Sequence, residues 1–579
     1  VEPLQQYLVE LPGGRLQALP LAWDTRAKSS GGQRWYHLYG SDEIDANDVL
    51  HWTRPAQNWN HMCAECHSTH VEKNYDPSAD RFDTTWSELS VGCEACHGGG
   101  AEHVARAKTG APGGLGVSFD ERKDVSWTRG PAATAARSKP RTTAKEVEAC
   151  AFCHSRRETL AQPFEPARPL LDHVSPELLT APYYAADGVM QDEVFTYGSF
   201  QQSKMAAAGV TCSDCHEPHA GTLRAPGNAL CNQCHDAQRF DSPAHHHHQS
   251  RSQGALCVSC HMPARTYMGV DVRHDHGFRV PRPDLAPHTQ SSSACNDCHR
   301  DRNAAWAARA IEAWFGPVRK GFQSHAKLFA QARAGTDVSE ELRTLAANPA
   351  LPAIVRATAL AELRAFGSEA TLRVVASAAR DGDALIRRAA SSALEAGTPA
   401  QIVELGLPLL SDPVRGVRVE AARVLASQKP GLIPASAAPA FERALEEYLA
   451  TQRLNADRAE AQNNLGVLHV LRAEAQQAEA AYRAAIRIEP AYVPSYVNLA
   501  DLYRAQARDA EGEALLRAAL ARAPDSAELS HALGLLLVRG KRYREALPEL
   551  ARAAKLDPKN ARFSYVFDAA RKAVIGAEP

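Results

Sequence analysis

"HMCAECHSTH", residues 61–70, places two cysteines three positions apart, with a histidine directly after the second. The same Cys-x-x-Cys-His pattern occurs seven times and accounts for all fourteen cysteines of the 579-residue chain. The cysteines are Cys63, Cys66, Cys93, Cys96, Cys150, Cys153, Cys212, Cys215, Cys231, Cys234, Cys257, Cys260, Cys295 and Cys298. The histidines that complete the motifs are His67, His97, His154, His216, His235, His261 and His299. This pentapeptide therefore organises the first half of the chain.

Three kinds of chemistry use closely spaced cysteines, and the histidine separates them. A zinc site takes its ligands from two cysteine pairs but does not require a histidine at the next position. A disulfide framework would also leave the histidines without a role. Covalent haem attachment needs every part of the motif, because two thioethers hold the edge of the porphyrin and the histidine binds the iron. The sequence predicts seven covalently bound haem c groups, with the seven motif histidines as proximal iron ligands.

The motifs also predict how the first 302 residues are built. All seven lie between Cys63 and His299, which leaves about 34 residues of chain for each haem. Because a haem is far larger than a side chain, we expect the haems to form the core, with short helices carrying the motifs. Ahead of them, "YLVELPGGRLQALPLAWD" alternates apolar and polar residues around a Pro-Gly-Gly turn and predicts a β-hairpin. Residues 1–60 should form this hairpin and an aromatic cover over the first haem.

After residue 302, alanine, leucine and arginine replace cysteine, and a repeat of 31 residues appears. Val355-Arg356, Ile386-Arg387 and Val417-Arg418 recur at this spacing, each within an apolar helix face. This pattern resembles HEAT-type helical repeats over residues 303–450. A plain helical linker is the alternative.

The last part of the chain, residues 451–579, shows a second period, of 34 residues. Leu465-Gly466, Leu499-Ala500 and Leu533-Gly534 follow it, and so do Pro490, Pro524 and Pro558. This period and pattern are typical of tetratricopeptide repeats, so we predict three repeats and a capping helix from about Arg562 to Val574. Such arrays dock a peptide or protein, here a redox partner or further copies of the chain. The alternative is a scaffold that only packs on the haem domain or on itself. The predicted fold is mainly α, a haem-packed domain followed by an α-solenoid.

The sixth ligand of each iron decides what the haems can do. Two histidines close the iron for electron transfer, whereas a missing sixth ligand leaves room for a substrate. Residues 1–302 contain fourteen histidines outside the motifs, twice the number that seven haems require. The distal candidates are His61, His70, His103, His173, His219, His245, His246, His247, His248, His274, His276 and His288, and His325 is a reserve beyond them. Of the run His245 to His248, we expect one residue to be a ligand.

Three motif segments carry a resemblance to a known superfamily. They are "GVTCSDCHEPH", "GNALCNQCH" and "GALCVSCHMP", which begin at residues 209, 227 and 254. They resemble the multihaem cytochromes that include pentahaem nitrite reductase, hydroxylamine oxidoreductase and octahaem tetrathionate reductase. The resemblance covers roughly residues 60–300 and implies closely packed haem pairs. The nitrite and tetrathionate reductases hold their catalytic haem by a lysine in place of the motif histidine, and this sequence has no Cys-x-x-Cys-Lys.

The resemblance also bears on location. Cytochromes c receive their haem outside the bacterial cytoplasm, and the chain begins at Val1 instead of methionine, which suggests a removed export signal. We therefore expect a periplasmic or extracellular protein. No apolar run approaches the eighteen residues that a membrane-spanning helix needs. With 65 basic and 67 acidic residues, the chain offers no charge argument for nucleic-acid binding.

Three functions remain open at this point. The first is an electron conduit of seven bis-histidine haems, docked to partners through the helical repeats. The second is an oxidoreductase that acts on a small nitrogen or sulfur oxyanion at one open haem. Its pocket would come from "TYMGVDVRHDHGFRVPRP", residues 266–283, and its candidate catalytic residues are Arg265, Tyr267, Arg273, His274 and His276. The third is a filament subunit, in which a histidine of one copy binds a haem of the next.

Overall fold

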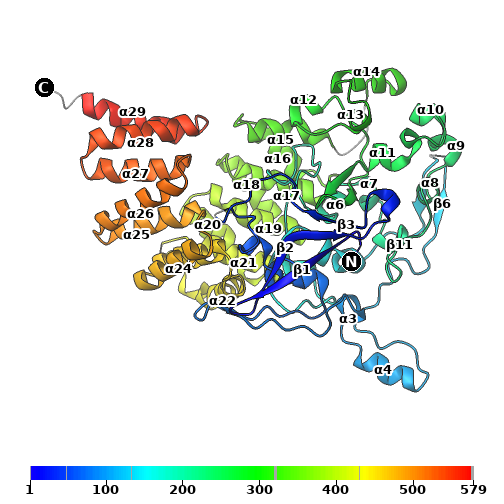
Figure 1. Cartoon of the computed structure of the whole chain (residues 1–579), viewed down its shortest axis with the longest axis horizontal. Coiled ribbons are helices and arrows are strands. Elements are labelled where there is room, and N and C mark those ends of the chain that lie inside the picture. The colour runs from blue at the N-terminus through cyan, green and yellow to red at the C-terminus, as the bar shows by residue number, and fades with distance from the viewer. Residues whose placement is uncertain (1, 47, 132, 319–322, 430, 576–579) are drawn as a thin grey trace.

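The computed structural model describes residues 2–46, 48–131, 133–318, 323–429 and 431–575. Val1, at which we expect the export signal to have been removed, and residues 576–579 of the predicted third domain lie outside these ranges. Figure 1 shows short elements at one end of the molecule and a stack of longer helices that leads to the C-terminus. We call residues 2–302 the motif region, residues 303–450 the middle region and residues 451–575 the repeat region.

The predicted N-terminal hairpin is confirmed. Strands β1 (Leu4–Leu11) and β2 (Arg15–Asp24) pair antiparallel, with a bulge between Gln6 and Leu8. The turn between them needs glycine, because Gly13 and Gly14 have φ values of 79° and 68°. A third strand, β3 (Arg34–His37), pairs with β2, although the sequence was interpreted there only as an aromatic cover.

Apart from this sheet, the motif region consists of short helices, as predicted, and of two-stranded ribbons, which the sequence did not predict. The ribbons are β4–β5 (Tyr75–Asp76 and Arg81–Phe82), β6–β7 (Trp127–Arg129 and Ala135–Arg137), β8–β9 (Arg157–Thr159 and Val174–Pro176), β10–β11 (His216–Glu217 and Thr222–Leu223) and β12–β13 (Ala264–Tyr267 and Asp271–His274). The helices that carry no motif cysteine are α1 (Trp59–Met62), α4 (Ala101–Lys108), α6 (Tyr197–Gln201), α7 (Lys204–Ala207), α9 (Ala237–Phe240), α10 (Pro243–His246) and α12 (Ala286–Thr289).

The middle region is helical, and its 31-residue period has a structural basis. Its helices are α14 (Ala304–Phe315), α15 (Ala326–Arg333), α16 (Ser339–Ala347), α17 (Ala353–Leu363), α18 (Glu369–Ala378), α19 (Ala384–Ala393), α20 (Pro399–Gly406), α21 (Arg415–Ala426) and α22 (Ala438–Leu454), the last of which crosses the predicted boundary at 450. The apolar residues of the period, Val355, Ile386 and Val417, are fully buried. The arginine after each one forms an ion pair with an acid further along the chain, Asp381, Asp412 and Glu447 in turn.

The repeat region contains the three predicted helix pairs and a final helix. They are α23–α24 (Ala459–Leu471 and Ala475–Ile488), α25–α26 (Val493–Ala505 and Asp509–Arg522), α27–α28 (Ala527–Arg539 and Tyr543–Leu556) and α29 (Ala561–Ile575). The small residues of the period allow the helices of a pair to approach closely. A Cβ on Gly466 would lie 2.4 Å from the ring of Tyr482, and one on Gly534 would lie 2.6 Å from the Leu550 side chain. Each period proline stands two residues after its helix pair ends.

The motif and middle regions share one hydrophobic core. Leu160, Leu179 and Tyr184 of the motif region pack into the cluster formed by helices α15 to α22. Polar contacts reinforce this packing, since the backbone N–H of Leu179 donates to the hydroxyl of Thr358 at 3.1 Å and that of Arg415 donates to Asp172 at 2.7 Å. The region that carries the third motif is therefore anchored on helices far downstream.

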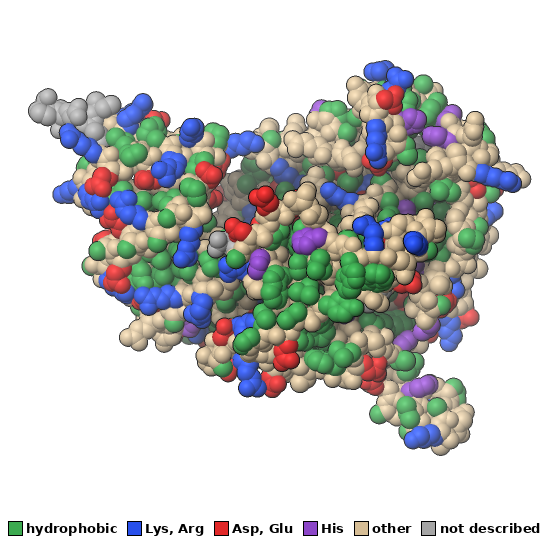
Figure 2. Space-filling model, viewed as in Figure 1, with side chains coloured by type: hydrophobic (Ala, Val, Ile, Leu, Met, Phe, Trp, Pro, Cys, Tyr) green, Lys and Arg blue, Asp and Glu red, His purple; other side chains and the backbone are tan. Residues whose placement is uncertain are grey.

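The surface carries no single dominant charge on the face shown in Figure 2. Basic and acidic side chains intermix over the repeat region, while hydrophobic side chains gather where Figure 1 places the N-terminal strands. Tyr7, Leu21 and Trp35 of these strands are about half exposed. Within the described ranges, no helix combines the length and apolar character needed to cross a bilayer.

Candidate haem-binding sites

Each Cys-x-x-Cys-His motif lies on a short helical turn that brings both thiols to one side. The turns are α2 (Ala64–His67), α3 (Cys93–His97), α5 (Lys145–His154), the 3-10 turn Cys212–Asp214, α8 (Asn228–Asn232) with the residues that follow it, α11 (Cys257–His261) and α13 (Ala294–Cys298). All fourteen cysteines are free thiols, each at least partly accessible. Among the described residues, no group of three or more His, Cys, Asp or Glu side chains is placed to hold a bare metal ion.

The motifs follow one another through space. In the first half, Cys66 lies 3.8 Å from the carbonyl oxygen of Cys153, so the first motif borders the third. The thiols of Cys150 and Cys212 form a hydrogen bond, which raises the pKa of Cys150 and joins the third motif to the fourth. The charge of Cys150 also raises the pKa of Cys96, after burial, because the second motif is close as well. The third motif therefore has the first, second and fourth as neighbours.

The second half of the series continues in chain order. Burial, followed by the nearby Asp214 and Cys234, raises the pKa of Cys215 to about 11, so the fourth motif borders the fifth. A hydrogen bond between the thiols of Cys231 and Cys257 joins the fifth to the sixth. Helix α11 then contacts α13, which brings the sixth motif against the seventh. The result is a line of motifs from the seventh to the third, with a fork to the first and second.

Four motif histidines face another imidazole at nearly the same spacing. Ring centres are 6.2 Å apart for His97 and His219 and 6.3 Å apart for His216 and His276. The ring centres of His261 and His245, and those of His299 and His248, are 6.1 Å apart. Two metal–nitrogen bonds of about 2 Å in line would set two imidazole centres roughly 6 Å apart. The residues therefore fit an iron held between two histidines.

The orientation of these rings supports the same interpretation. Nδ1 of His97, His261 and His276 hydrogen-bonds a backbone carbonyl oxygen, at 3.1, 2.7 and 2.9 Å respectively. Nδ1 of His248 does the same at 2.5 Å. An Nδ1–H donor leaves the lone pair of Nε2 available for a metal, and such a bond is usual for metal-binding histidines. Burial lowers the pKa of His261 and His276, which favours the neutral imidazole that a metal needs.

The run His245 to His248 supplies two of the four opposed rings, although we expected one. His245 lies in α10 and faces the sixth motif. His247 adopts a left-handed conformation, with φ of 56°, and its ring stacks on Trp314 at 4.0 Å. The chain therefore turns at His247, and His248 faces the seventh motif instead of the sixth.

The other distal candidates are scattered. His61 contacts Lys73 and Asp457, and His70 contacts Glu94. Nδ1 of His103 and of His274 each bonds a backbone carbonyl, and His103 and His288 are exposed. His173 is buried, and neither ring nitrogen has a hydrogen-bond partner in the described part of the chain. His246 accepts from the backbone of His248, and the reserve His325 is buried beside Phe329.

The candidate catalytic residues lie on the β12–β13 ribbon and the loop after it, and most make internal contacts. Arg265 donates to the carbonyl of Met190, and the Tyr267 hydroxyl donates to that of Asp192. Arg273 pairs with Asp271 and Glu193. His276 faces His216, and His274 has Nδ1 bound to the carbonyl of Met262. These five residues lie on one ribbon and the loop after it, and the polar groups named here contact other parts of the protein.

Comparisons with known proteins agree with the motif chemistry. Residues 204–240 match the family model described as doubled CXXCH motif, and residues 25–98 match the model described as cytochrome c554 and c-prime. No curated protein matches the chain.

Solved structures with similar helices include MamA and the yeast Tom70, at 16% and 13% identity and TM-scores of 0.18 and 0.26. MamA is matched over 34% of this chain and 85% of its own, and Tom70 over 44% and 59%. A thermophilic TPR protein of Thermus thermophilus is matched at 22% identity and a TM-score of 0.21, over 40% of this chain and 98% of its own. Together, the two family models and the Cys-x-x-Cys-His motifs support a multihaem c-type cytochrome with covalently bound haem c.

Proposed function

We propose that the chain is a heptahaem electron conduit. Each of the seven motifs binds one haem through its two cysteines, and its histidine is the proximal ligand. The observation that carries the proposal is the set of four opposed histidine pairs, which assigns His219, His276, His245 and His248 as distal ligands. Two imidazoles leave no open position on the iron, and such a haem accepts and releases electrons without binding a substrate.

The arrangement of the motifs supports transfer through the protein. Each motif has at least one neighbouring motif, so the haems would form a continuous path that forks at the third. The motif region also has little apolar core of its own between residues 204 and 302. Among the described residues there, the buried apolar side chains are Ala206, Ala255, Val270, Pro283 and Leu285. Haems packed against one another would supply the missing core.

We propose that the protein works in the periplasm or outside the cell, where covalent haem is attached. The repeat region offers three helix pairs that are free of motifs. Such arrays dock proteins in most chains that carry them, so we assign it to a redox partner or to further copies of the chain.

Electron paramagnetic resonance of the oxidised protein, quantified against total haem, tests this proposal. We expect low-spin ferric signals from the four paired haems at least, after allowance for magnetically coupled neighbours. A spectrum dominated by high-spin iron would contradict the proposal, because bis-histidine ligation gives low-spin iron. The haem content of the same sample, measured by mass, tests the number seven.

One distal ligand can be tested alone. Replacing His276 by alanine should convert one low-spin haem to high spin, because His216 would lose the imidazole that faces it at 6.3 Å. His37→Ala is the control, since that side chain is exposed and is not among the distal candidates. If H276A keeps every low-spin signal, His276 is not a ligand.

A second candidate function is an oxidoreductase with one open haem. The observation in its favour is that, among the described residues, no imidazole ring is opposed to His67, His154 or His235 in the way of the four pairs. A high-spin signal approaching one per chain in the wild-type protein would identify such a haem. Nitrite, hydroxylamine and tetrathionate would then be tested for binding to that iron.

A further inference from the structure

The repeat region meets the motif region beside the first motif. The end of α22 and the turn that follows it carry the contacts, since the Thr451 hydroxyl donates to the carbonyl of Leu160 at 2.9 Å. The Asn455 amide donates to the carbonyl of Thr159 at 2.8 Å, and Arg458 donates to the carbonyl of Pro55 at 3.1 Å. This turn therefore packs against α1 and the strand β8, close to Cys63.

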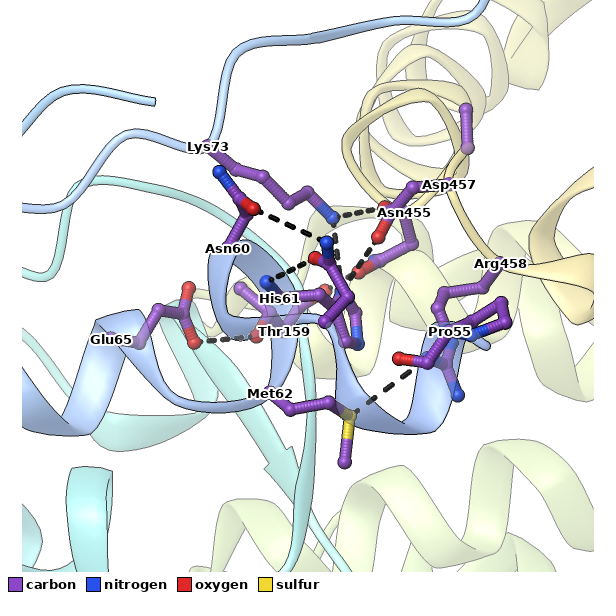
Figure 3. A network of polar contacts seen from close by, with 12 residues as sticks. Pro55, Asn60, His61, Met62, Glu65, Lys73, Thr159, Asn455, Asp457 and Arg458 are labelled. Atoms are coloured by element: carbon purple, nitrogen blue, oxygen red, sulfur yellow. Dashed lines mark hydrogen bonds and ion pairs between the residues drawn. The ribbon is translucent and has the colours of Figure 1, made fainter. Parts of the chain in front are cut away.

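Asp457 enters this junction as a buried carboxylate between two side chains of the motif region (Figure 3). One of its oxygens accepts a hydrogen bond from the ammonium of Lys73, and the other lies 3.2 Å from Nδ1 of His61. The side chains of Lys73 and Asp457 are 3% and 6% exposed. His61 and Lys73 hold the pKa of Asp457 well below its usual range, so the carboxylate is charged.

A buried lysine–carboxylate pair balances its own charge and does not need a histidine. The neutral ring of His61 can carry its proton on Nε2 or on Nδ1, and its hydrogen-bond partners differ between the two tautomers. If Nδ1 accepted a hydrogen bond from Lys73, at 3.1 Å, Nε2 would carry the proton and lack an acceptor among the described residues. If Nδ1–H donates to Asp457, Nε2 is an unprotonated lone pair. The second arrangement pairs Nδ1–H with a buried carboxylate oxygen, which is the contact that a carboxylate commonly makes with a metal-binding histidine.

That second arrangement is the one found in the opposed histidines. His97, His261, His276 and His248 all have Nδ1 bonded to an oxygen, and the centre of each ring lies 6.1 to 6.3 Å from the centre of a second imidazole. Burial lowers the pKa of His61, which keeps the ring neutral. The side chain of His61 is still 22% exposed, so the ring is not fully enclosed by protein.

The junction itself has no room for a substrate. The cavity there, lined by His61, Lys73 and Asn455 among others, has a volume of about 10 Å³, enough for roughly one water molecule. The polar groups at this site therefore serve the protein and not a bound small molecule.

We propose that Asp457 is a positioning residue for His61 and that His61 is the distal ligand of a haem near the first motif. This inference rests on the proposed function, since it gives a ligand to one of the three haems without an opposed imidazole. The carboxylate would fix the ring through Nδ1 and raise the electron donation of Nε2. The repeat region thus takes part in the ligation of one haem, and its docking on the motif region sets the properties of that haem.

The ligand is tested with the full-length protein. His61→Ala should convert one low-spin haem to high spin, as judged by paramagnetic resonance. Thr451→Val is the control, because it removes a hydrogen bond of the same junction without touching His61. Unchanged low-spin signals in H61A would overturn the inference while leaving the conduit intact, whereas high-spin iron throughout the wild-type protein would instead overturn the proposed function.

The positioning role is tested by two substitutions with opposite expected signs. Asp457→Asn removes the charge behind His61 and should raise the reduction potential of one haem, because the ferric state loses electron donation. Lys73→Met removes the other partner of Asp457, so that the carboxylate interacts with His61 alone. This substitution should lower the reduction potential of the same haem. The reduction potentials are measured by spectroelectrochemical titration, with T451V as the control. A charge that acts through space alone would give the same two shifts in the His61→Ala background, whereas a positioning role through His61 would give none there.

Discussion

Replacing Cys150 and Cys153 by serine should divide the electron path into three unconnected parts, which are the first haem, the second haem, and the haems of the fourth to seventh motifs. The third motif borders the first, second and fourth, so its loss removes the haem through which all three communicate. Electron tunnelling weakens steeply with distance. We therefore expect transfer from the seventh haem to the first and second to slow by several orders of magnitude.

A photoreductant placed at one end of the path measures this effect. It can be attached to a cysteine introduced at Asp301, which is exposed and two residues beyond the seventh motif. In the wild-type protein, all haems should be reduced in one rapid phase. In C150S/C153S, only the haems of the fourth to seventh motifs should be reduced in the rapid phase.

The control removes a haem at a branch end. With Cys93 and Cys96 replaced by serine, the path from the third motif to the first is preserved, so the first haem should still be reduced rapidly. If the first haem is reduced as quickly without the third motif as with it, the neighbouring motifs do not describe the path of electrons.

Leu179→Ala should destabilise the motif and middle regions together, by about 2–5 kcal/mol. Leu179 is fully buried in the core that residues 160–194 share with helices α15 to α22, so a cavity there weakens both sides. Denaturant unfolding should show haem absorption and helical circular dichroism shifting to lower denaturant by the same amount.

Leu516→Ala is the matched control for this experiment. Leu516 is as deeply buried, but it lies in a separate cluster within the repeat region. Truncating Leu516 should lower the free energy of unfolding of the repeat helices. The denaturant midpoint of the haem absorption should not change. Separate haem and helix transitions in L179A would show that the two regions are independent in stability.

The parts of the fold that sequence predicted are those set by local periodicity. The 34-residue period places Gly466 and Gly534 where helices of a pair cross, and both positions leave no space for a Cβ. The strand β3 and the shared core escaped prediction. Leu178, Leu179 and Tyr184 show no helical period, and their partners on α17 and α15 lie well over a hundred residues away.

The candidate sites could likewise be predicted from the sequence only where the signal is local. The motifs define the covalent attachment points locally, and nearby histidines such as His219 and His276 could be proposed because short connections limit where they lie. Which ring faces which motif depends on the fold: the chain turns at the left-handed residue His247, and the ring of His248 then lies opposite His299 of the seventh motif. Asp457 had no sequence signal, because it acts on His61 across almost four hundred residues of chain.

The core shared by the motif and middle regions also constrains when haem can be attached to the third motif during folding. Cys150 and Cys153 lie on α5, whose flanks are held by residues that pack on α17 and α21. In the folded chain these two thiols are partly accessible, but the segment that follows them is fixed in place by helices of the C-terminal half. We expect the third haem to be attached while the C-terminal half is still unfolded, so that secretion and haem supply must keep pace with each other.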